Sequence, residues 1–391
     1  MKTILIFTQE YVLPNQTTCG GTGNFYKRYA DALLEKGLNV VVFGSNKFAV
    51  DEQRENLRIH FVKRNYFKTH PIQDLLRSLG RKLHIKSLEI YFLKKEIAYL
   101  TKKLAQFIKE ENIAVDIIET HDWGGYSLYL DKLNIPYVVR THGSDTILKK
   151  YFGFKVSVNR EIIEQEALKK VRNFIFVSET SKKMYNETFH KEGFLIHNGI
   201  MLPNCIPTSV IKHSIFFFGA AIVQKGIDIA LKVFNNIEKI FTDATLHIVG
   251  GGYEEYLKQH GIKSKKNIIN YGYLKDKELL TTINKADIFI FPSRGETFGL
   301  ALCEAMALEK PIIASNIVSF NSIITNGENG FIANNIDEYC QYITKIFKDN
   351  TLREKISIQA KLRVLRDFNF ENTVERSLLY YKKIRDDHYV L

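Results

Sequence analysis

The chain has 391 residues, 45% of them apolar and 25% charged, which is typical of a soluble globular protein of about two domains. No run of about 18 apolar residues exists, which excludes a membrane-spanning helix, and we expect the apolar start to be a first strand and not a signal peptide. The net charge of +12 favours anionic partners. The four cysteines lack metal-ligand spacing and predict reduced thiols in a cytoplasmic protein: Cys19, Cys205, Cys303 and Cys340.

The first half of the chain predicts a βαβ arrangement. Thr3–Thr8 and Asn39–Phe43 are short apolar runs typical of buried strands, and Asn24–Lys36 between them has apolar residues at helical spacing. Gly20 and Gly21 precede this helix. An NAD fingerprint is not expected, because the third glycine of G-x-G-x-x-G is missing and the glycines do not directly follow the strand.

The segment 58–110 carries much of the positive charge, with thirteen Lys and Arg against four Asp and Glu, a net +9. Residues 67–110 predict amphipathic helices, for which two interpretations remain open. The basic helices lie on an anionic membrane surface, or they cover the sheet and expose a solvated lysine face. No aromatic-basic motif of nucleic-acid binding accompanies the charge, so we expect no nucleic-acid partner.

Polar residues follow the next two predicted strands, Val115–Glu119 and Tyr137–Thr141. Asp122 and Trp123 come after the first, and His142 comes after the second. The carboxyl ends of parallel strands meet at one edge of a sheet, where ligands bind. An indole face can stack on a sugar ring. A structural role is the alternative for His142.

The second half repeats the strand–helix pattern after a linker predicted at 201–212, where two prolines occur. Lys225 and Gly226 follow its first strand. The predicted elements are strands at Ile215–Phe218, Leu246–Val249, Ile268–Tyr271, Ile288–Phe291 and Ile312–Ala314, with a helix at 227–241.

The stretch Asp287–Ala307 combines a buried strand, a glycine loop and a helix start. Glu296 and Glu304 bracket the loop, with seven residues between them. The amides of Phe298, Gly299 and Leu300 would be free donors at the helix N-terminus, which predicts an anion site: Phe298, Gly299 and Leu300. A nucleotide diphosphate sugar, with hydroxyl groups on both sides of a diphosphate, fits such a site.

The sequence SRGETFGLALCEAMALEKPIIAS resembles the E-x7-E region of the retaining GT-B glycosyltransferases of family 4. The resemblance extends over nearly the whole chain and is loosest between residues 45 and 110. It implies an α/β GT-B fold, in which two Rossmann-like domains face each other across a cleft. The expected divisions are an acceptor-side domain at 1–200, a linker at 201–212, a nucleotide-sugar domain at 213–365 and a helix at 366–391 that returns to the first domain.

The resemblance also implies roles for individual residues. Glu296 contacts the donor sugar, Glu304 the ribose hydroxyls and Lys225 the leaving diphosphate, while His142 lies beside the donor sugar. The glycine pair lets the backbone approach the donor phosphates: Gly20 and Gly21. The loop after the third predicted strand is the acceptor side: Asp122 and Trp123.

The sequence departs from the family pattern at several positions. Ala220 stands where an arginine is usual, and Arg294 is the candidate replacement by its proximity to the loop. Val318-Ser319 stand where a glycine pair is common, and Ser322 stands where a glutamate is common.

We therefore predict a retaining hexosyltransferase that uses a UDP- or GDP-linked sugar, needs no metal and no further cofactor, and acts on a glycan or a lipid-linked acceptor. The setting is cell-surface polysaccharide assembly, in the cytoplasm or peripherally on the inner face of the membrane. The alternatives are a nucleotide-sugar epimerase or hydrolase of the same fold, and a catalytically weak nucleotide-sugar-binding protein.

Overall fold

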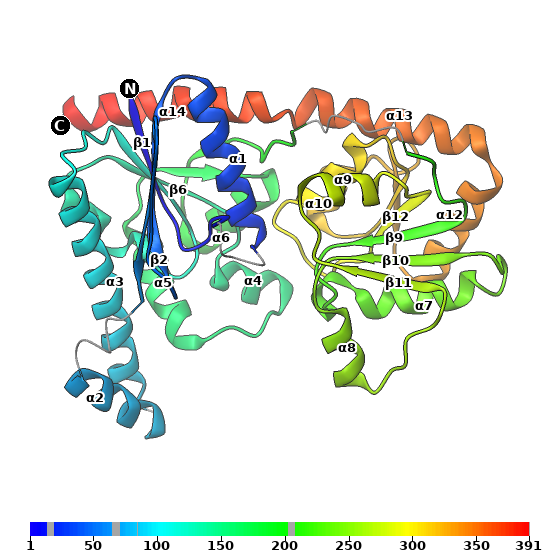
Figure 1. The fold of residues 1–391 in the computed structure, drawn as a ribbon, viewed down its shortest axis with the longest axis horizontal. Helices are drawn as coiled ribbons and strands as arrows, with labels where there is room; N and C mark the ends of the chain where they lie inside the picture. The colour runs from blue at the N-terminus through cyan, green and yellow to red at the C-terminus, as the bar shows by residue number, and fades with distance from the viewer. Residues whose placement is uncertain (14–18, 65–70, 84, 202–207, 391) are drawn as a thin grey trace. The chain divides into compact units, whose positions relative to one another are not determined.

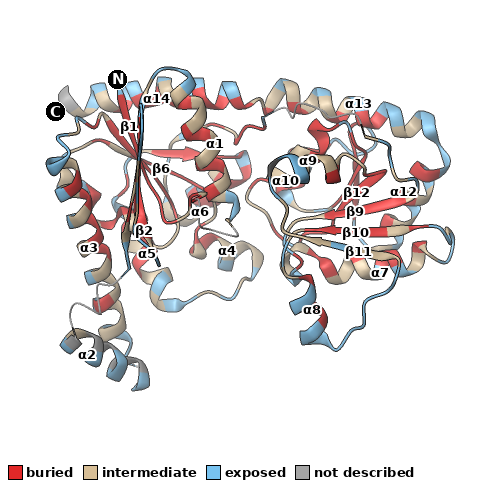
Figure 2. Ribbon diagram, viewed as in Figure 1, coloured by how far each residue is buried: buried red, intermediate tan, exposed pale blue. Residues whose placement is uncertain are grey.

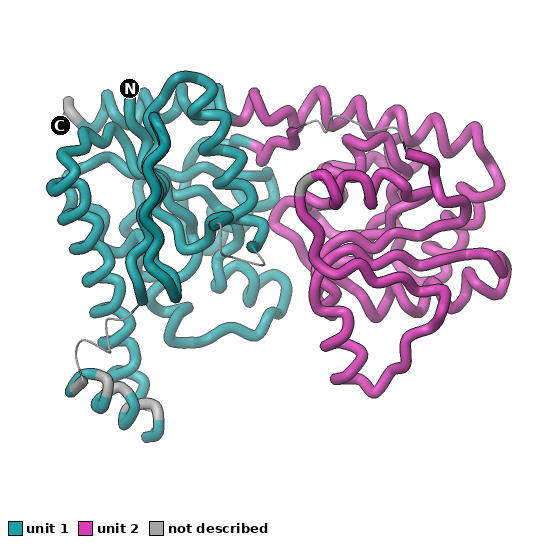
Figure 3. Tube along the Cα trace, viewed as in Figure 1, with its two compact units in different colours: residues 1–196, 374–391 teal, residues 197–373 magenta. Residues whose placement is uncertain are grey.

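A computed structural model describes residues 1–13, 19–64, 71–83, 85–201 and 208–390. It divides the chain into two compact units (Figure 3). Unit 1 comprises Met1–Ile196 and Val374–Leu391, and unit 2 comprises His197–Thr373. The sequence placed these divisions at residues 200 and 366, and much of the expected linker, with Cys205, lies outside the described residues.

Unit 1 is built on an eight-stranded sheet of order β3-β4-β2-β1-β5-β6-β7-β8 (Figure 1). All neighbouring strands are parallel except β3 and β4, which form an antiparallel edge. The strands are β1 (Thr3–Phe7), β2 (Asn39–Asn46), β3 (Val50–Arg54), β4 (Leu57–Lys63), β5 (Ile117–His121), β6 (Tyr137–Arg140), β7 (Phe174–Phe176) and β8 (Phe194–Leu195).

Helices cover this sheet because its central strands are apolar on both faces, as in doubly wound folds (Figure 2). The helical segments are α1 (Gly21–Glu35), α2 (Pro71–Lys82), α3 (Lys86–Glu110), η1 (Tyr126–Leu133), α4 (Asp145–Phe152), α5 (Val158–Lys170), α6 (Glu179–Phe189) and α14 (Phe370–Val390), the last of which belongs to unit 1 from Val374 onward.

The two helices of the basic segment differ in how they pack. Helix α3 buries Leu100, Leu104 and Phe107 in the core formed with β1 and β2. Helix α2 lies beyond the end of α3 (Figure 1) and exposes its apolar residues. The interpretation of an ordinary covering helix therefore holds for α3 alone. None of the described helices combines the length and apolar character that crossing a bilayer requires.

A buried ion pair lies at the centre of unit 1. Arg140 on β6 and Glu119 on β5 have fully buried side chains, and the guanidinium Nε donates to Glu119 Oε1 at 2.8 Å. Ser377 Oγ accepts from Arg140 at 2.9 Å, and the Tyr381 hydroxyl donates to Glu119. The hydroxyls of Tyr29 and Tyr381 lie 2.9 Å apart. The pair thus joins α1, two strands and α14.

Unit 2 is built on a six-stranded parallel sheet of order β11-β10-β9-β12-β13-β14. Ile215 of β9 pairs with Leu246 on one side and Ile288 on the other, so the strand order reverses at β9. The strands are β9 (Ser214–Phe218), β10 (Thr245–Val249), β11 (Ile268–Gly272), β12 (Ile288–Phe291), β13 (Ile312–Ser315) and β14 (Phe331–Ala333).

The core of unit 2 places the apolar faces of α7 and α12 against these strands, with Ala230, Phe234 and Ile343 fully buried. The helical segments are η2 (Val223–Lys225), α7 (Ile227–Ile237), α8 (Tyr253–His260), α9 (Asp276–Ile283), α10 (Leu300–Ala307), α11 (Val318–Asn321), α12 (Ile336–Lys348) and α13 (Asn350–Asp367). In an open parallel sheet, ligands bind at the carboxyl ends of the strands where the order reverses. In unit 2 this point is the end of β9 and β12.

We expect Glu119→Ala to destabilise unit 1 by about 3–5 kcal/mol, because it leaves the Arg140 guanidinium buried without its counter-charge. Asp31→Ala, which breaks the exposed Lys27–Asp31 pair, should cost less than about 1 kcal/mol. Urea unfolding followed by emission of the single tryptophan, Trp123 in unit 1, measures both. Equal losses for the two variants would contradict the importance of the buried pair.

Candidate functional site

In unit 2 the loops after β9 and β12 are joined closely. The Arg294 amide donates to the Gln224 carbonyl at 2.9 Å. Gly226 has φ +80°, and a Cβ at this position would come within 2.0 Å of the Pro292 carbonyl oxygen. Only glycine therefore allows this approach, and the contact fixes Lys225 beside the glutamate loop.

Lys225 and Glu296 form an ion pair at this edge. Lys225 Nζ donates to Glu296 Oε1 at 2.5 Å, and Ser293 Oγ donates to the same oxygen at 3.1 Å. The two side chains are 36% and 17% exposed, so the ammonium remains open to solvent. The structure thus brings together two residues that lie 71 positions apart in the sequence.

Arg294 has a different environment from the one that its sequence position suggested. Its two terminal nitrogens donate to the carboxylate of Asp228 at 2.8 and 2.7 Å, and one of them also contacts the Val223 carbonyl. These donors hold η2 and the start of α7 against the loop after β12. This geometry shows Arg294 paired with Asp228. It does not show Arg294 in the diphosphate-binding role expected of a replacement for the arginine missing at Ala220.

The glycine loop ends at the N-terminus of α10. Gly299 has φ +115°, is the N-cap and offers no side chain to the first-turn amides, which begin at Leu300. A Cβ at Gly299 would lie 2.9 Å from the Phe320 ring. Phe298 is buried beside His197 and Phe368, so its side chain has a packing role.

Glu304 lies one turn into α10 and is half-buried. Ala220, by contrast, is exposed after β9 and carries no charge, and Val318 is exposed at the start of α11. A second phosphate-binding cation is therefore not supplied by these positions.

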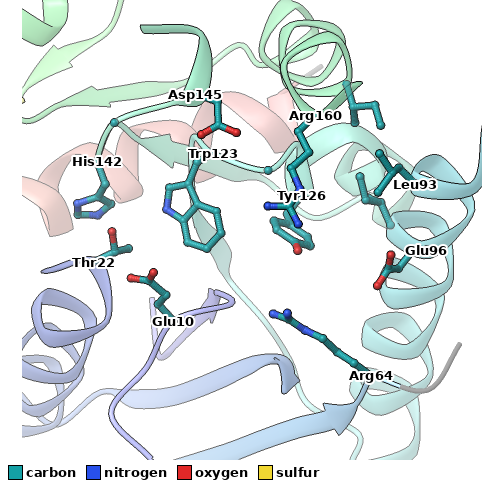
Figure 4. A pocket seen from close by; sticks show the side chains of 14 residues that line it. Glu10, Thr22, Arg64, Leu93, Glu96, Trp123, Tyr126, His142, Asp145 and Arg160 are labelled. Carbon is teal, nitrogen blue, oxygen red and sulfur yellow. The ribbon is translucent and has the colours of Figure 1, made fainter. Parts of the chain in front are cut away.

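Unit 1 contains a cavity of about 320 Å³ at the carboxyl ends of its strands (Figure 4). Trp123 and Tyr126 form its aromatic surface, with ring centroids 6.1 Å apart and planes at 88°. The other lining residues that matter below are Glu10, Thr22, Arg64, Glu96, His142, Asp145 and Arg160.

His121 positions the cavity tryptophan. The two rings stack at 3.8 Å with 12° between their planes. His121 Nε2 accepts from the Gln9 amide at 3.3 Å, and Nδ1 lies 3.1 Å from the Trp123 carbonyl. Burial lowers the pKa of His121 to about 3, so the ring is neutral and donates from Nδ1.

Asp122 supports the loop that carries His142, and its predicted place on the acceptor side stays a prediction. Its side chain is buried, and its oxygens accept from the amides of His142 at 2.9 Å and Gly143 at 3.0 Å. The Tyr185 hydroxyl donates to it as well. Both carboxylate oxygens are therefore used to hold the chain that carries His142.

His142 lines the cavity and packs against Phe25 and Tyr26, with ring centroids 5.0 and 5.3 Å away. Burial and the neighbouring Arg140 charge lower the pKa of His142 well below its ordinary value. The ring is therefore a neutral imidazole, suited to hydrogen bonding.

The predicted glycine pair lies at the start of α1, next to the cavity. A Cβ on Gly20 would come within 2.6 Å of Glu10 Oε2, whereas one on Gly21 would meet no atom within 4 Å. Packing against Glu10 thus explains why residue 20 is a glycine. The space beside Gly21 leaves the N-terminus of α1 open to approach. Contact of this pair with a donor phosphate stays a prediction.

Several residues were missed by sequence reasoning. Glu10 comes three residues after the end of β1 and Arg64 directly follows β4, and the strand-end rule that selected Trp123 would have found both. Glu164 had no such signal, because it lies inside α5. It is buried and accepts from the amides of Gly124, Asp145 and Thr146, and burial raises its pKa to about 7.

Within the described residues, no group of three or more His, Cys, Asp or Glu side chains is arranged to hold a metal ion.

Two family models match the chain. One is described as Glycosyltransferase Family 4 and covers residues 19–202, and the other is described as Glycosyl transferases group 1 and covers residues 211–363. The phosphatidyl-myo-inositol mannosyltransferase of Mycobacterium leprae is 23% identical over 282 residues, which cover 69% of this chain and 74% of that protein.

Solved structures share the fold. Sucrose-phosphate synthase of Thermosynechococcus elongatus has a TM-score of 0.73 at 15% identity and covers 98% of this chain and 99% of its own. Alr3699/HepE of Anabaena, in complex with UDP and glucose, has a TM-score of 0.70 at 16% identity and covers 97% and 99%. The fold class predicted from the sequence, GT-B, is confirmed.

The neutral state of buried His121 predicts a pH dependence of stability. The unfolded chain titrates near 6.5 and takes up the proton first as the pH falls. The free energy of unfolding of unit 1 should therefore decrease from pH 6.5 toward 3, with a slope approaching about 1.4 kcal/mol per pH unit from this residue.

His121→Asn should remove this part of the slope, and His190→Asn, at an exposed position in unit 1, should keep it. Urea unfolding followed by Trp123 emission at several pH values measures the slope. The same slope in wild type and His121→Asn would refute the assignment.

Proposed function

We propose that this chain, which belongs to the glycosyltransferases of group 1 and family 4, transfers a hexose from a nucleotide diphosphate sugar to a glycan or lipid-linked acceptor with retention at the anomeric carbon. The single observation that carries the proposal is the Lys225–Glu296 pair beside the α10 N-terminus, at the reversal point of the unit 2 sheet.

This arrangement supplies a cation and backbone amides for a diphosphate. Lys225 is paired with Glu296 in the structure. When the donor binds, Lys225 exchanges Glu296 for a diphosphate oxygen, and Glu296 becomes free to accept from hexose hydroxyls. Glu304 lies farther along α10, where it would bind the ribose hydroxyls. Charge developing on the leaving diphosphate is then stabilised by Lys225 and by the first-turn amides of α10.

Retention follows in this proposal because the acceptor attacks the face of the sugar that the diphosphate leaves, with no protein nucleophile taking part. The leaving diphosphate accepts the proton of the acceptor hydroxyl, which attacks from the same face of the sugar. His142, a neutral imidazole in unit 1, is proposed to hydrogen-bond the transferred hexose. Two similar proteins support a UDP-linked donor and a lipid-linked acceptor: Alr3699/HepE forms a complex with UDP and glucose, and the mycobacterial relative is a phosphatidyl-myo-inositol mannosyltransferase.

The donor site is tested by thermal melting with UDP, GDP, ADP and NAD. We expect one nucleoside diphosphate to raise the melting temperature of the wild type, and we expect a smaller rise in Glu304→Ala, because a ligand that binds the folded state more weakly stabilises it less at the same concentration. Lys225→Ala should lower turnover by about 10²–10³-fold, the effect of removing one oxyanion donor. Lys232→Ala, on the exposed face of α7, is the control for lost charge.

No melting shift with any nucleotide would sink the donor-site assignment. Turnover unchanged in Lys225→Ala would remove the lysine from it. The anomeric configuration of the product, determined by NMR before mutarotation, checks retention.

We further propose that α2 holds the protein at an anionic membrane surface. Five apolar residues at helical spacing are 43–74% exposed in this segment: Ile72, Leu75, Leu76, Leu79 and Leu83. Lys82 and Lys86 next to them are exposed as well. An apolar helix face with basic neighbours inserts at the boundary between headgroups and acyl chains. The part of the predicted surface at 67–70 lies outside the described residues.

Leu75→Ser with Leu79→Ser should reduce binding to vesicles of phosphatidylglycerol and phosphatidylcholine at least about tenfold, since each buried leucine contributes about 1.5–3 kcal/mol. Leu379→Ser removes an exposed leucine from α14 and should leave binding unchanged. Sedimentation with vesicles that contain or lack phosphatidylglycerol measures the apolar and the electrostatic contributions to binding. Binding that ignores lipid charge, or that survives the double substitution, would contradict the proposal.

A further inference from the structure

The cavity of unit 1 has two chemically different halves, which lie on either side of its aromatic residues (Figure 4). Glu10 and Thr22 line the half beside α1, near His142. Their oxygens can accept hydrogen bonds from sugar hydroxyls. Arg64 and Arg160 line the half beside α3, together with Glu96.

The two arginines form no close ion pair with the residues that the structure describes, although the charge of Arg160 acts on Asp145. Arg64 Nε donates to Ser45 Oγ at 3.1 Å and its Nη2 donates to Gln9 Oε1 at 3.3 Å, so its partners are neutral groups that fix its direction. Neither Arg64 nor Arg160 is within ion-pair distance of a carboxylate in the part of the chain that the structure describes. Their charges are therefore available to a ligand.

The charges of both guanidinium groups act on the Tyr126 hydroxyl. Burial raises the pKa of the Tyr126 hydroxyl, while the charges of Arg64 and Arg160 lower it and that of Glu96 raises it. Figure 4 shows the two arginines directed toward Tyr126 from opposite sides, although one follows β4 and the other belongs to α5. Asp145 lines the cavity as well, and burial raises its pKa while the charge of Arg160 lowers it, so the two arginines face two carboxylates at this end, Glu96 and Asp145.

The apolar walls of the half of the cavity beside α3 favour ion binding. Leu93, Ile97 and Ile163 line the same half of the cavity, and Ile97 and Ile163 are buried. Apolar walls exclude water and strengthen the interaction between a guanidinium and an anion. The cavity of about 320 Å³ lies at the lower end of the range for small-ligand sites, about 300–1,000 Å³.

We propose that Arg64 and Arg160 bind an anionic group of the acceptor, a phosphate or a carboxylate, while the acceptor sugar stacks on Trp123 and its hydroxyls face Glu10. The acceptor is then an anionic glycoconjugate and not a neutral sugar. Arginine suits this role because its planar fork binds carboxylate and phosphate oxygens in pairs. That the bound group belongs to an acceptor rests on the proposed glycosyl transfer, but anion binding at this site can be tested without turnover.

The single tryptophan of the chain lies in this cavity, so its emission reports occupancy directly. The probes are α-glucose 1-phosphate, glucuronate and the neutral methyl α-glucoside, each titrated into the full-length protein. We expect at least one anionic probe to bind at least about tenfold tighter than methyl α-glucoside. If the phosphate probe alone does so, the anion is a phosphate; if glucuronate does so as well, a sugar carboxylate suffices.

Arg64→Gln and Arg160→Gln should each weaken the anionic probe at least about tenfold and leave methyl α-glucoside unchanged. Arg172→Gln, at an exposed arginine elsewhere in unit 1, is the matched control and should behave as the wild type. Circular dichroism confirms that the variants are folded.

Three results would overturn the proposal: equal affinity for charged and neutral probes, no effect of either arginine substitution, or no emission change with any probe. The titration is repeated in Lys225→Ala, because loss of the signal in that variant would assign the anion to unit 2 and also refute the proposal. Nucleotide melting of the wild type tests the donor site separately, so failure here and failure of the proposed transfer are distinguished.

Discussion

The buried pair of Arg140 and Glu119 is the constraint on which unit 1 depends. Removing two charges from water costs several kcal/mol per ion, and the pair persists only where further partners compensate it. Those partners come from distant parts of the chain, Ser377 and Tyr381 on α14 and the ring of Tyr29 on α1, which lies 5.2 Å from the guanidinium carbon. The core of unit 1 is therefore incomplete until the last helix has docked, and the two strands that bear the pair also carry the cavity loops.

At the ends of these strands, buried polar groups hold the loops in place and other side chains line the cavity. Three side chains there are buried and form hydrogen bonds to backbone amides and carbonyls: His121, Asp122 and Glu164. They fix Trp123 and the His142 loop, and none of the three lines the cavity. A site built on such supports is preorganised, because its side chains need little reordering when a ligand arrives.

The sequence predicted the elements best where packing is local. Ile288–Phe291 is a strand as expected, because an apolar run between a polar residue and a proline has few alternatives. Chemical roles were harder, since Arg294 looked like a phosphate ligand and its partner, Asp228, lies 66 residues away. Asp122 was similarly ambiguous, because a carboxylate after a strand can face a ligand or hold a loop. The antiparallel strand β3 was missed because its polar sequence VDEQR has no apolar alternation.

Two of the ion pairs of unit 2, Arg294–Asp228 and Lys225–Glu296, differ in how firmly they hold their cation. Arg294 binds Asp228 through two parallel contacts and a carbonyl through a third, a geometry that an incoming anion would have to break at several points. Lys225 meets Glu296 with a compact ammonium on a flexible stem, and its side chain is more than one-third exposed. At the donor site proposed above, a diphosphate arriving at α10 would therefore compete with a single contact of Lys225. Because Ala220 contributes no charge, the affinity of the proposed site for a donor would depend on how readily Lys225 leaves Glu296.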